Sequence, residues 1–211
     1  MVKWKNYSCV FIDTLIVKKI NIYSFKNYIF DNLSLKRKHM IKYLVAFSLI
    51  LTLFSCAKSK HKIGDMYKGG YIFKINMWGK GLCAAPTDKK GGLKWGCYGS
   101  LIDGADGEEV GDGEQNTKDI VDMCEEMSAA KYCDEYEVDG YDDWYLPSIG
   151  ELELMYSQLH ANGLGAFSSG KYWSSTENFS LGAWHFNFGT AERGNNEHKG
   201  TSLTFRPIRS F

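Results

Sequence analysis

The chain has 211 residues, and its 25 basic and 25 acidic side chains give a formal net charge of zero. This balance argues against a nucleic-acid binder that relies on a basic surface, so we expect no nucleic-acid partner. An aromatic content of 15% fits a packed core and excludes a disordered chain.

The charges are nonetheless segregated along the chain. Residues 1–55 carry a net charge of +7, whereas residues 56–211 carry −7. Every glycine and proline lies from Gly64 onward. Because turn-forming residues are confined to this part, we expect one folded domain there, long enough to bury about two thirds of its unfolded surface.

Residues 40–55 have the pattern of a lipoprotein signal peptide. The apolar run 43–54 follows Lys42 and is too short to span about 30 Å of hydrocarbon. The ending Leu53-Phe54-Ser55-Cys56 resembles a bacterial lipobox, in which the cysteine is acylated and becomes the mature N-terminus. We therefore predict lipidation of Cys56, with a core helix or an uncleaved anchor as the alternative.

The segments on either side of this signal have simpler interpretations. Residues 1–39 precede Met40 and are not needed by a secretory signal, so we interpret them as a mis-called extension, with a long basic n-region as the alternative. Residues 56–68 form a basic tether, either solvated or lying against anionic head groups. Because the positions after Cys56 are basic, we favour an outer-membrane lipoprotein on the periplasmic side over display on the cell surface.

Strand patterns come first in the exported domain, over residues 70–75 and 81–85, and the chain resumes as a strand at 93–95. Residues 100–115 read as a long loop, after which Asn116 or Thr117 can cap a helix.

A second helix is predicted from Ser148, because Ser148 and Glu151 match a capping box, and Asn162-Gly163 should end it. Strand patterns return over residues 172–175, 183–188 and 202–211. This order, with helices between two groups of strands, predicts an α+β fold with two helices and antiparallel strands.

Four cysteines remain in this domain: Cys83, Cys97, Cys124 and Cys133. In an oxidising compartment they suggest two disulfides, and a zinc site is the weaker alternative because no C-x-x-C occurs. Loop-closure entropy favours neighbours, so we expect Cys83–Cys97 and Cys124–Cys133. The second bond requires the helix begun near Thr117 to break between Glu125 and Ala130, since a continuous helix would hold these cysteines about 13.5 Å apart.

The domain also resembles a known family over nearly its whole length. The motifs that carry the resemblance are Gly81-Leu82 with Ala84-Ala85, Trp95-Gly96-Cys97, Asn116-Thr117, residues 140–148 (GYDDWYLPS), Glu151-Leu152, residues 172–177 (YWSSTE), Ala183-Trp184, Lys199 and residues 206–211 (RPIRSF). Together they resemble the Lcl C-terminal domain family of exported bacterial proteins, here assigned to residues 69–211.

The resemblance implies a C-type-lectin-like mixed domain in which N- and C-terminal strands pair and a long loop region carries ligand contacts. Accordingly, residues 71–75 are expected to pair with residues 205–209. Our candidate ligand contacts are Trp184, His185, Glu177 and Asn178.

Other residues favour structure over chemistry. We expect Trp144 and Trp173 in the core rather than on a sugar-binding platform. The acidic stretch 103–114 could hold Ca²⁺ but fails the EF-hand spacing, so we expect no metal or cofactor. Arg206 or Arg209 is expected to be buried against a carboxylate such as Glu177 or Glu151.

No nucleophile elbow, phosphate loop or metal motif is present in the sequence. The leading hypothesis is a lipid-anchored, non-catalytic module that binds a glycan or another envelope protein. An envelope enzyme using an exposed cysteine pair, and a purely structural lipoprotein, are the alternatives.

Overall fold

The computed structural model describes residues 42–44 and 61–211. The chain divides into two compact units, Met1–Cys56 and Ala57–Phe211, and the fold below is that of the second. The predictions on the 1–39 extension, the lipobox and Cys56 lie outside the described residues. In the part of the chain that is described, no helix is both long and apolar enough to span a bilayer.

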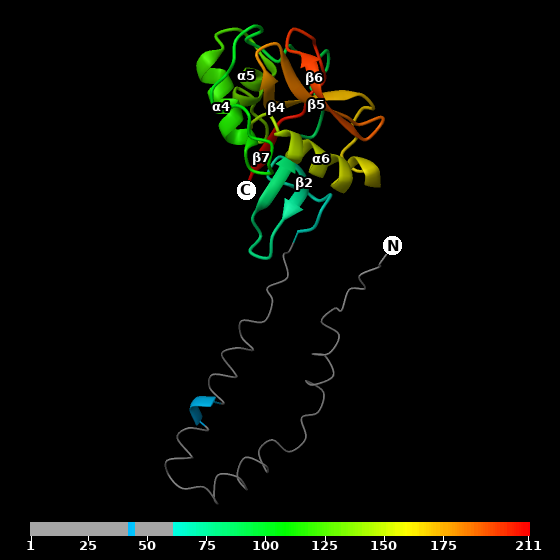
Figure 1. Ribbon diagram of the computed structural model, residues 1–211. Helices are drawn as coiled ribbons and strands as arrows, with labels where there is room; N and C mark the ends of the chain where they lie inside the picture. Colours follow the sequence, from blue (N-terminus) through cyan, green and yellow to red (C-terminus); the bar gives the residue numbers. More distant parts are fainter. Residues whose placement is uncertain (1–41, 45–60) are drawn as a thin grey trace, which may run out of the picture. The chain divides into compact units, whose positions relative to one another are not determined.

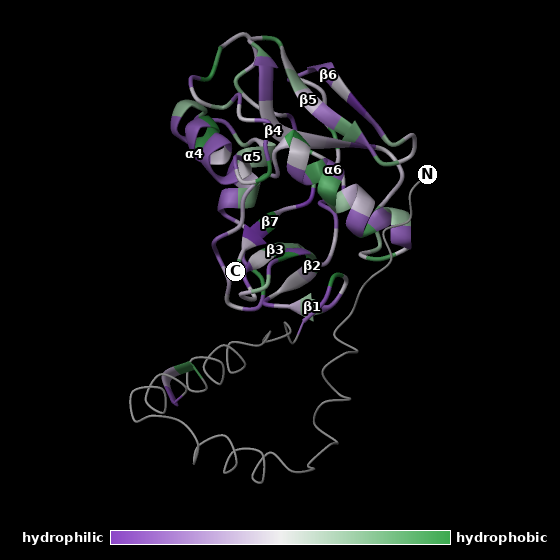
Figure 2. Ribbon diagram, turned by 60° about the horizontal axis from the view of Figure 1, so that its bottom comes forward, coloured by the Kyte–Doolittle hydropathy of each residue, from purple (hydrophilic) through white to green (hydrophobic). Residues whose placement is uncertain are grey.

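Two antiparallel sheets form the framework of the domain (Figure 1). The first has the strand order β1-β2-β3-β7, with β1 at Met66–Tyr67, β2 at Gly70–Ile75, β3 at Gly81–Ala84 and β7 at Ile208–Ser210. The second has the order β4-β5-β6, with β4 at Lys171–Phe179, β5 at Gly182–Asn187 and β6 at Glu192–His198. The two sheets lie at opposite ends of the domain in both views (Figures 1 and 2).

The first sheet unites the two ends of the domain, which confirms that N- and C-terminal strands share one sheet. The partner of the last strand is β3, since Leu82 lies opposite Ser210 and Ala84 opposite Ile208. The finer expectation that residues 71–75 pair directly with residues 205–209 is wrong. Strand β3 pairs with β2 along one edge and with β7 along the other, so it lies between them.

Three α-helices connect the sheets, rather than the two that were expected: α4 at Gly113–Met123, α5 at Ala129–Asp134 and α6 at Ile149–Gln158. The capping box of α6 is confirmed, because Ser148 Oγ accepts from the Glu151 amide while the Glu151 side chain accepts from the Ser148 amide. A 3₁₀ turn at His160–Asn162 then ends at Gly163, whose left-handed conformation stops the helix as predicted.

The expected break after the first helix is also present. The helix ends at Met123, and Ser128 caps α5 by accepting a hydrogen bond from the Lys131 amide. Its start was placed wrongly: α4 begins at Gly113 after Asp112, not at Asn116 or Thr117. Both of these side chains are instead used inside the domain, where Thr117 Oγ1 accepts from the Leu146 amide at 3.0 Å and Asn116 Nδ2 donates to Gly107 O at 2.7 Å.

Strand β6 was missed because it carries no strand pattern. Its sequence ERGNNEH is polar throughout, and most of its side chains are exposed at the edge of the second sheet. Strand propensity reflects the packing of side chains on a half-buried surface. Strand β6 is held instead by its backbone pairing with β5.

Two apolar clusters form most of the core. One surrounds α6, which lies between the two sheets and contacts both through residues such as Leu152 and Met155 (Figure 2). The other lies between α4, α5 and β4, around Trp95 and Trp173. Trp144 and Trp173 are 2% and 0% exposed, so both are core residues as expected.

Candidate ligand-binding surface

Exposed apolar and aromatic side chains gather where the loop 97–101 meets the turn between β4 and β5. Tyr98 is 52% exposed, Phe179 41%, Leu181 42% and Leu101 66%. The imidazole of His198 stacks on the Tyr98 ring, with 4.1 Å between ring centroids. We call this the aromatic–polar surface, and define it by Tyr98, Leu101, Asn178, Phe179, Leu181 and His198.

Backbone hydrogen bonds join the segments that carry this surface. The Gly99 amide donates to Ser180 O, and the Lys199 amide donates to Leu181 O, each at 3.0 Å. Asn178 Nδ2 donates to Asn195 O at 2.5 Å, which links β4 to β6. At Gly182 a Cβ atom would lie 2.8 Å from the Phe179 ring, so the glycine leaves room for that ring to lie over the turn. The surface is therefore presented in one defined arrangement.

A buried ion pair lies beneath it. Lys199 Nζ, on a side chain with no exposed area, contacts Glu177 Oε1 and donates to Ser100 O at 2.8 Å. The Glu177 carboxylate also accepts from the Ile102 amide at 3.0 Å, and the ammonium group lies 4.4 Å from the centre of the Trp95 ring. Burial lowers the pKa of Lys199, and the bond to Glu177 acts in the opposite direction.

This pair changes the role assigned to Glu177. Glu177 is 4% exposed, and its carboxylate contacts Lys199 and accepts from the Ile102 amide, so it supports the loop beneath the surface. Its neighbour Asn178 lies at the surface itself. Of the four candidate contacts, Asn178 is the one that belongs to the aromatic–polar surface.

A disulfide between Cys97 and Cys124 fastens the other side of the loop, with 5.5 Å between the two Cα atoms. Cys97 adopts a left-handed backbone conformation (φ 44°) that turns the chain back to the end of α4. Its amide donates to Glu126 Oε1 at 2.9 Å, which reinforces the approach.

The expected pairing of neighbouring cysteines is thus wrong. Cys83 and Cys133 are both free and buried, Cys83 in the middle of the first sheet and Cys133 in α5 within the second apolar cluster. Loop entropy favoured short loops, but tertiary packing holds these two thiols away from Cys97 and Cys124. Burial raises the pKa of Cys83 to about 12, although the adjacent Arg209 partly opposes this, and burial raises that of Cys133 as well.

Trp184 and His185 occupy opposite faces of β5, as strand geometry requires. Trp184 is half-buried, packs against the α6 cluster and lies 5.6 Å from the guanidinium carbon of Arg193. His185 is 7% exposed, on the same face of the sheet as the ion pair between Lys171 and Glu197. Its Nδ1 has no hydrogen-bond partner within the described residues, and burial, then Lys171, lowers its pKa.

The two arginines near the C-terminal end are both buried against carboxylates, but not those expected. Arg206 Nε donates to Asp88 Oδ1 at 2.7 Å, and Arg209 Nη2 donates to Asp143 Oδ2 at 2.6 Å. Asp88 also accepts from the Tyr172 hydroxyl at 2.6 Å. Glu177 pairs with Lys199 instead of with either arginine.

Glu151 forms no ion pair among the described residues. Besides capping α6, its carboxylate accepts from the Gly111 amide at 3.1 Å and lies 3.4 Å from the Tyr145 hydroxyl. Burial raises the pKa of Glu151 to about 7, although hydrogen bonds from the Ser148 and Gly111 backbones oppose the shift. We assign this carboxyl a structural role, because its oxygens are occupied by the start of α6 and the 109–113 loop.

Three carboxylates of the acidic loop are used in contacts within the domain. Asp112 Oδ2 accepts from the Glu109 amide at 2.8 Å, Glu108 contacts Arg193 at 3.4 Å and Glu114 pairs with Lys118 at 2.6 Å. Within residues 42–44 and 61–211, no group of three or more His, Cys, Asp or Glu side chains is placed to hold a metal ion.

Sequence reasoning did not single out Tyr98, Phe179 or His198. The sequence does offer one signal. Tyr98 lies between Cys97 and Gly99, and Phe179 lies just before the Ser-Leu-Gly turn. Aromatic side chains at such turn positions are poorly placed to reach the core. The stack of Tyr98 on His198 joins positions 100 residues apart, and no local pattern indicates it.

Comparison with known proteins gives one family and a more distant fold neighbour. No curated protein matches the chain. A solved structure, described as a fimbrial protein from Bacteroides ovatus ATCC 8483, is 17% identical, with a TM-score of 0.44, over 61% of this chain and 35% of that one. The chain thus spans about a third of the fimbrial protein's length, and the likeness is too weak to carry an argument. The family model of the Lcl C-terminal domain matches residues 85–209, more than half of the sequence, so the chain belongs to the Lcl C-terminal domain family.

Proposed function

We propose that this protein is a lipid-anchored component of the bacterial envelope whose domain binds a ligand, without catalysis, through the aromatic–polar surface. Membership of a family of exported bacterial domains supports the location. The observation that carries the binding proposal is the exposed Tyr98–His198 stack beside Phe179, held over a buried ion pair and a disulfide. An ordered surface of this kind binds with little loss of conformational entropy.

The chemistry of the surface favours a neutral saccharide. Flat aromatic faces next to amide and hydroxyl groups suit the apolar face and the hydroxyls of a sugar ring. Residues 83–211 contain 10 basic and 22 acidic side chains, so a polyanionic ligand would be repelled. We therefore propose lectin-like binding of a saccharide. A protein partner in the envelope is the second ligand class.

The anchor is the other half of the proposal. The apolar run 43–54 and the Leu-Phe-Ser-Cys ending support cleavage before Cys56 and its acylation, with the protein held at the outer membrane on the periplasmic side. We expect Cys56→Ala to release the protein from the membrane fraction. A variant that stays there with an unprocessed mass would show a spanning helix instead, and protease shaving of intact cells tests the side.

The enzyme alternative gains no support from the cysteines. It needs an exposed thiol pair, whereas Cys83 and Cys133 are buried with raised pKa values that disfavour the thiolate. A thiol count on the folded protein should find neither reactive, and denaturation without reductant should expose both.

A glycan array, run with and without Ca²⁺, tests the binding proposal. We expect the full chain to bind neutral glycans equally under both conditions and Tyr98→Ala to abolish the signal. Trp78→Ala is the matched control, because it removes an exposed aromatic side chain from the other sheet. Binding that survives Tyr98→Ala would place the site elsewhere, and the absence of any glycan or envelope-protein ligand would favour a structural lipoprotein.

A further inference from the structure

The turn between β2 and β3 presents the two most exposed large apolar side chains of residues 61–211. Trp78 is 80% exposed and Met77 is 72% exposed. The turn is nevertheless ordered, because Asn76 Oδ1 accepts from the Trp78 amide at 2.9 Å and from the Lys80 amide at 3.1 Å. Two apolar side chains at the tip of an ordered hairpin are costly to leave in water, so a partner that covers them is expected.

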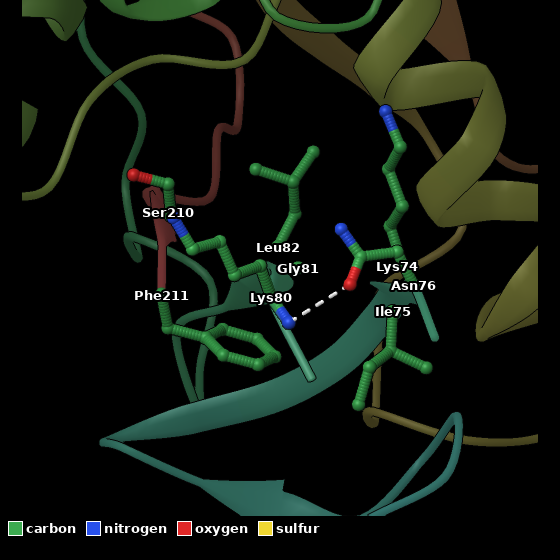
Figure 3. A pocket seen from close by; sticks show the side chains of 8 residues that line it. All are labelled: Lys74, Ile75, Asn76, Lys80, Gly81, Leu82, Ser210 and Phe211. Carbon is green, nitrogen blue, oxygen red and sulfur yellow. Dashed lines mark hydrogen bonds between the residues drawn. The ribbon is translucent and has the colours of Figure 1, made fainter. Parts of the chain in front are cut away.

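A shallow pocket of about 420 Å³ opens at the base of the same hairpin, lined by Lys74, Ile75, Asn76, Lys80, Gly81, Leu82, Ser210 and Phe211 (Figure 3). The side chains of Lys74 and Lys80 leave the hairpin on either side of Leu82 (Figure 3). Neither ammonium group forms an ion pair within the part of the chain that the structure describes. The hairpin therefore combines apolar tips with uncompensated positive charge.

The distribution of charge singles out this end of the domain. Residues 57–82 contain six lysines and one acidic residue, Asp65, whereas residues 83–211 contain 22 acidic and 10 basic side chains. Lys68 lies on the same end, with its ammonium 5.9 Å from the centre of the Phe211 ring. An anionic partner is thus attracted to the hairpin and repelled by the rest of the domain.

The start of the described domain lies beside this hairpin. The His61 ring stacks on Tyr67 at 4.0 Å, Tyr67 contacts Phe211 edge-on at 5.2 Å, and the Phe211 backbone pairs with Gly81 at the foot of the hairpin. Four residues separate His61 from Cys56. A chain spans at most about 3.6 Å per residue, so these five steps reach no farther than about 18 Å.

We propose that the Met77–Trp78 tip and the lysines around it dock on the anionic leaflet that holds the Cys56 anchor. Trp78 would lie at the level of the head groups, where tryptophan is enriched, with Met77 beside the acyl chains and Lys74 and Lys80 against lipid phosphates. This inference rests on the proposed lipid anchor, and adds a second membrane contact to it. The β4-β5-β6 sheet, next to which the aromatic–polar surface lies, is at the other end of the domain from this hairpin (Figures 1 and 2).

Fluorescence quenching by brominated lipid tests the docking. The full chain is extracted from membranes and reconstituted into vesicles of phosphatidylcholine and phosphatidylglycerol with bromine on the upper acyl chain. The difference between the wild type and Trp78→Phe isolates the Trp78 signal, which we expect to be quenched. The matched control is Trp78→Phe combined with Leu101→Trp, which moves an exposed indole to the aromatic–polar surface and should escape quenching.

Charge neutralisation adds a graded readout. Lys74→Gln and Lys80→Gln should each lower the ratio of docked to undocked domain by roughly fivefold, and pure phosphatidylcholine should weaken docking further. Equal quenching at both indole positions, or none at Trp78, overturns the proposal. Mass spectrometry of the extracted chain distinguishes the lipid anchor from the docking. An unacylated Cys56 would contradict both proposals. An acylated chain without quenching of Trp78 would contradict the docking alone.

Discussion

The first sheet and the aromatic–polar surface are held in place by different interactions. The β1-β2-β3-β7 sheet relies on backbone pairing with the last strand and on apolar packing against α6. The aromatic–polar surface next to the β4-β5-β6 sheet relies on the Lys199–Glu177 pair and the Cys97–Cys124 disulfide, which hold the loop 97–102 against the sheet and α4. The first sheet is thus held by many backbone and apolar contacts. The aromatic–polar surface depends on a small number of contacts that single substitutions can remove.

Removing the last eight residues tests the first sheet and should have the largest effect. The deletion takes away β7, Arg206 and Arg209, and it exposes one edge of β3 together with the carboxylates of Asp88 and Asp143. We expect the truncated protein to lose its cooperative thermal transition, followed by circular dichroism. A retained sharp transition would show that β7 is dispensable and would count heavily against this account.

Breaking the buried ion pair tests the second sheet. Glu177→Gln leaves the Lys199 ammonium buried without its counter-charge, and we expect a loss of about 3–5 kcal/mol in the free energy of unfolding. Lys171→Met is the control, because the Lys171 side chain is 45% exposed and the expected loss from an exposed pair is about 0–1 kcal/mol. Urea denaturation measures both, and similar losses for the two variants would contradict the framework role of Lys199 and Glu177.

The pH dependence of stability tests Glu151, at the junction between α6 and the acidic loop. Its folded pKa of about 7 lies above the ordinary value of 4.5, so between these values the folded state binds more protons than the unfolded state. Stability should therefore fall by about 3 kcal/mol as the pH rises from 4.5 to 7. Glu151→Gln keeps the capping acceptor and should remove this slope; an unchanged slope would assign it to other groups.

The disulfide gives a somewhat smaller effect on the same surface. Cys97→Ser with Cys124→Ser should lower the free energy of unfolding by about 2–4 kcal/mol. Because Cys124 is itself only 1% exposed, reduction of the wild type is the control: it breaks the same bond without placing a serine in the core. Non-reducing peptide mapping should link the Cys97 and Cys124 peptides, and a Cys83–Cys97 fragment would contradict the structure.

Much of the fold follows from local sequence signals. The Ser148–Glu151 capping box, the Gly163 stop and the break before Ser128 each involve residues within a few positions of one another, so local rules suffice. Strand β6 escaped these rules because its polar side chains lie at a sheet edge. The place of β3 beside β7 also escaped, since this pairing joins segments more than 120 residues apart.

The candidate surface was less predictable, because it joins distant segments. Asn178, a candidate ligand contact, lies on the aromatic–polar surface, whereas its neighbour Glu177 is buried against Lys199, 22 residues away. The cysteines show the same limit: entropy ranks the possible loops, whereas packing of Cys83 in β3 and of Cys133 in α5 decides which thiols meet. Charges and aromatic rings that meet across the fold leave no periodic pattern in the sequence.

We propose that the aromatic–polar surface is the ligand face and that the hairpin end is not. The most direct measurement is calorimetric titration of the strongest glycan from the array against the full chain, Tyr98→Ala and Trp78→Ala. We predict that Tyr98→Ala weakens affinity by about tenfold or more, through loss of ring stacking, and that Trp78→Ala leaves it unchanged. Weaker binding by Trp78→Ala with unchanged binding by Tyr98→Ala would contradict the claim and place the ligand site at the β2–β3 hairpin.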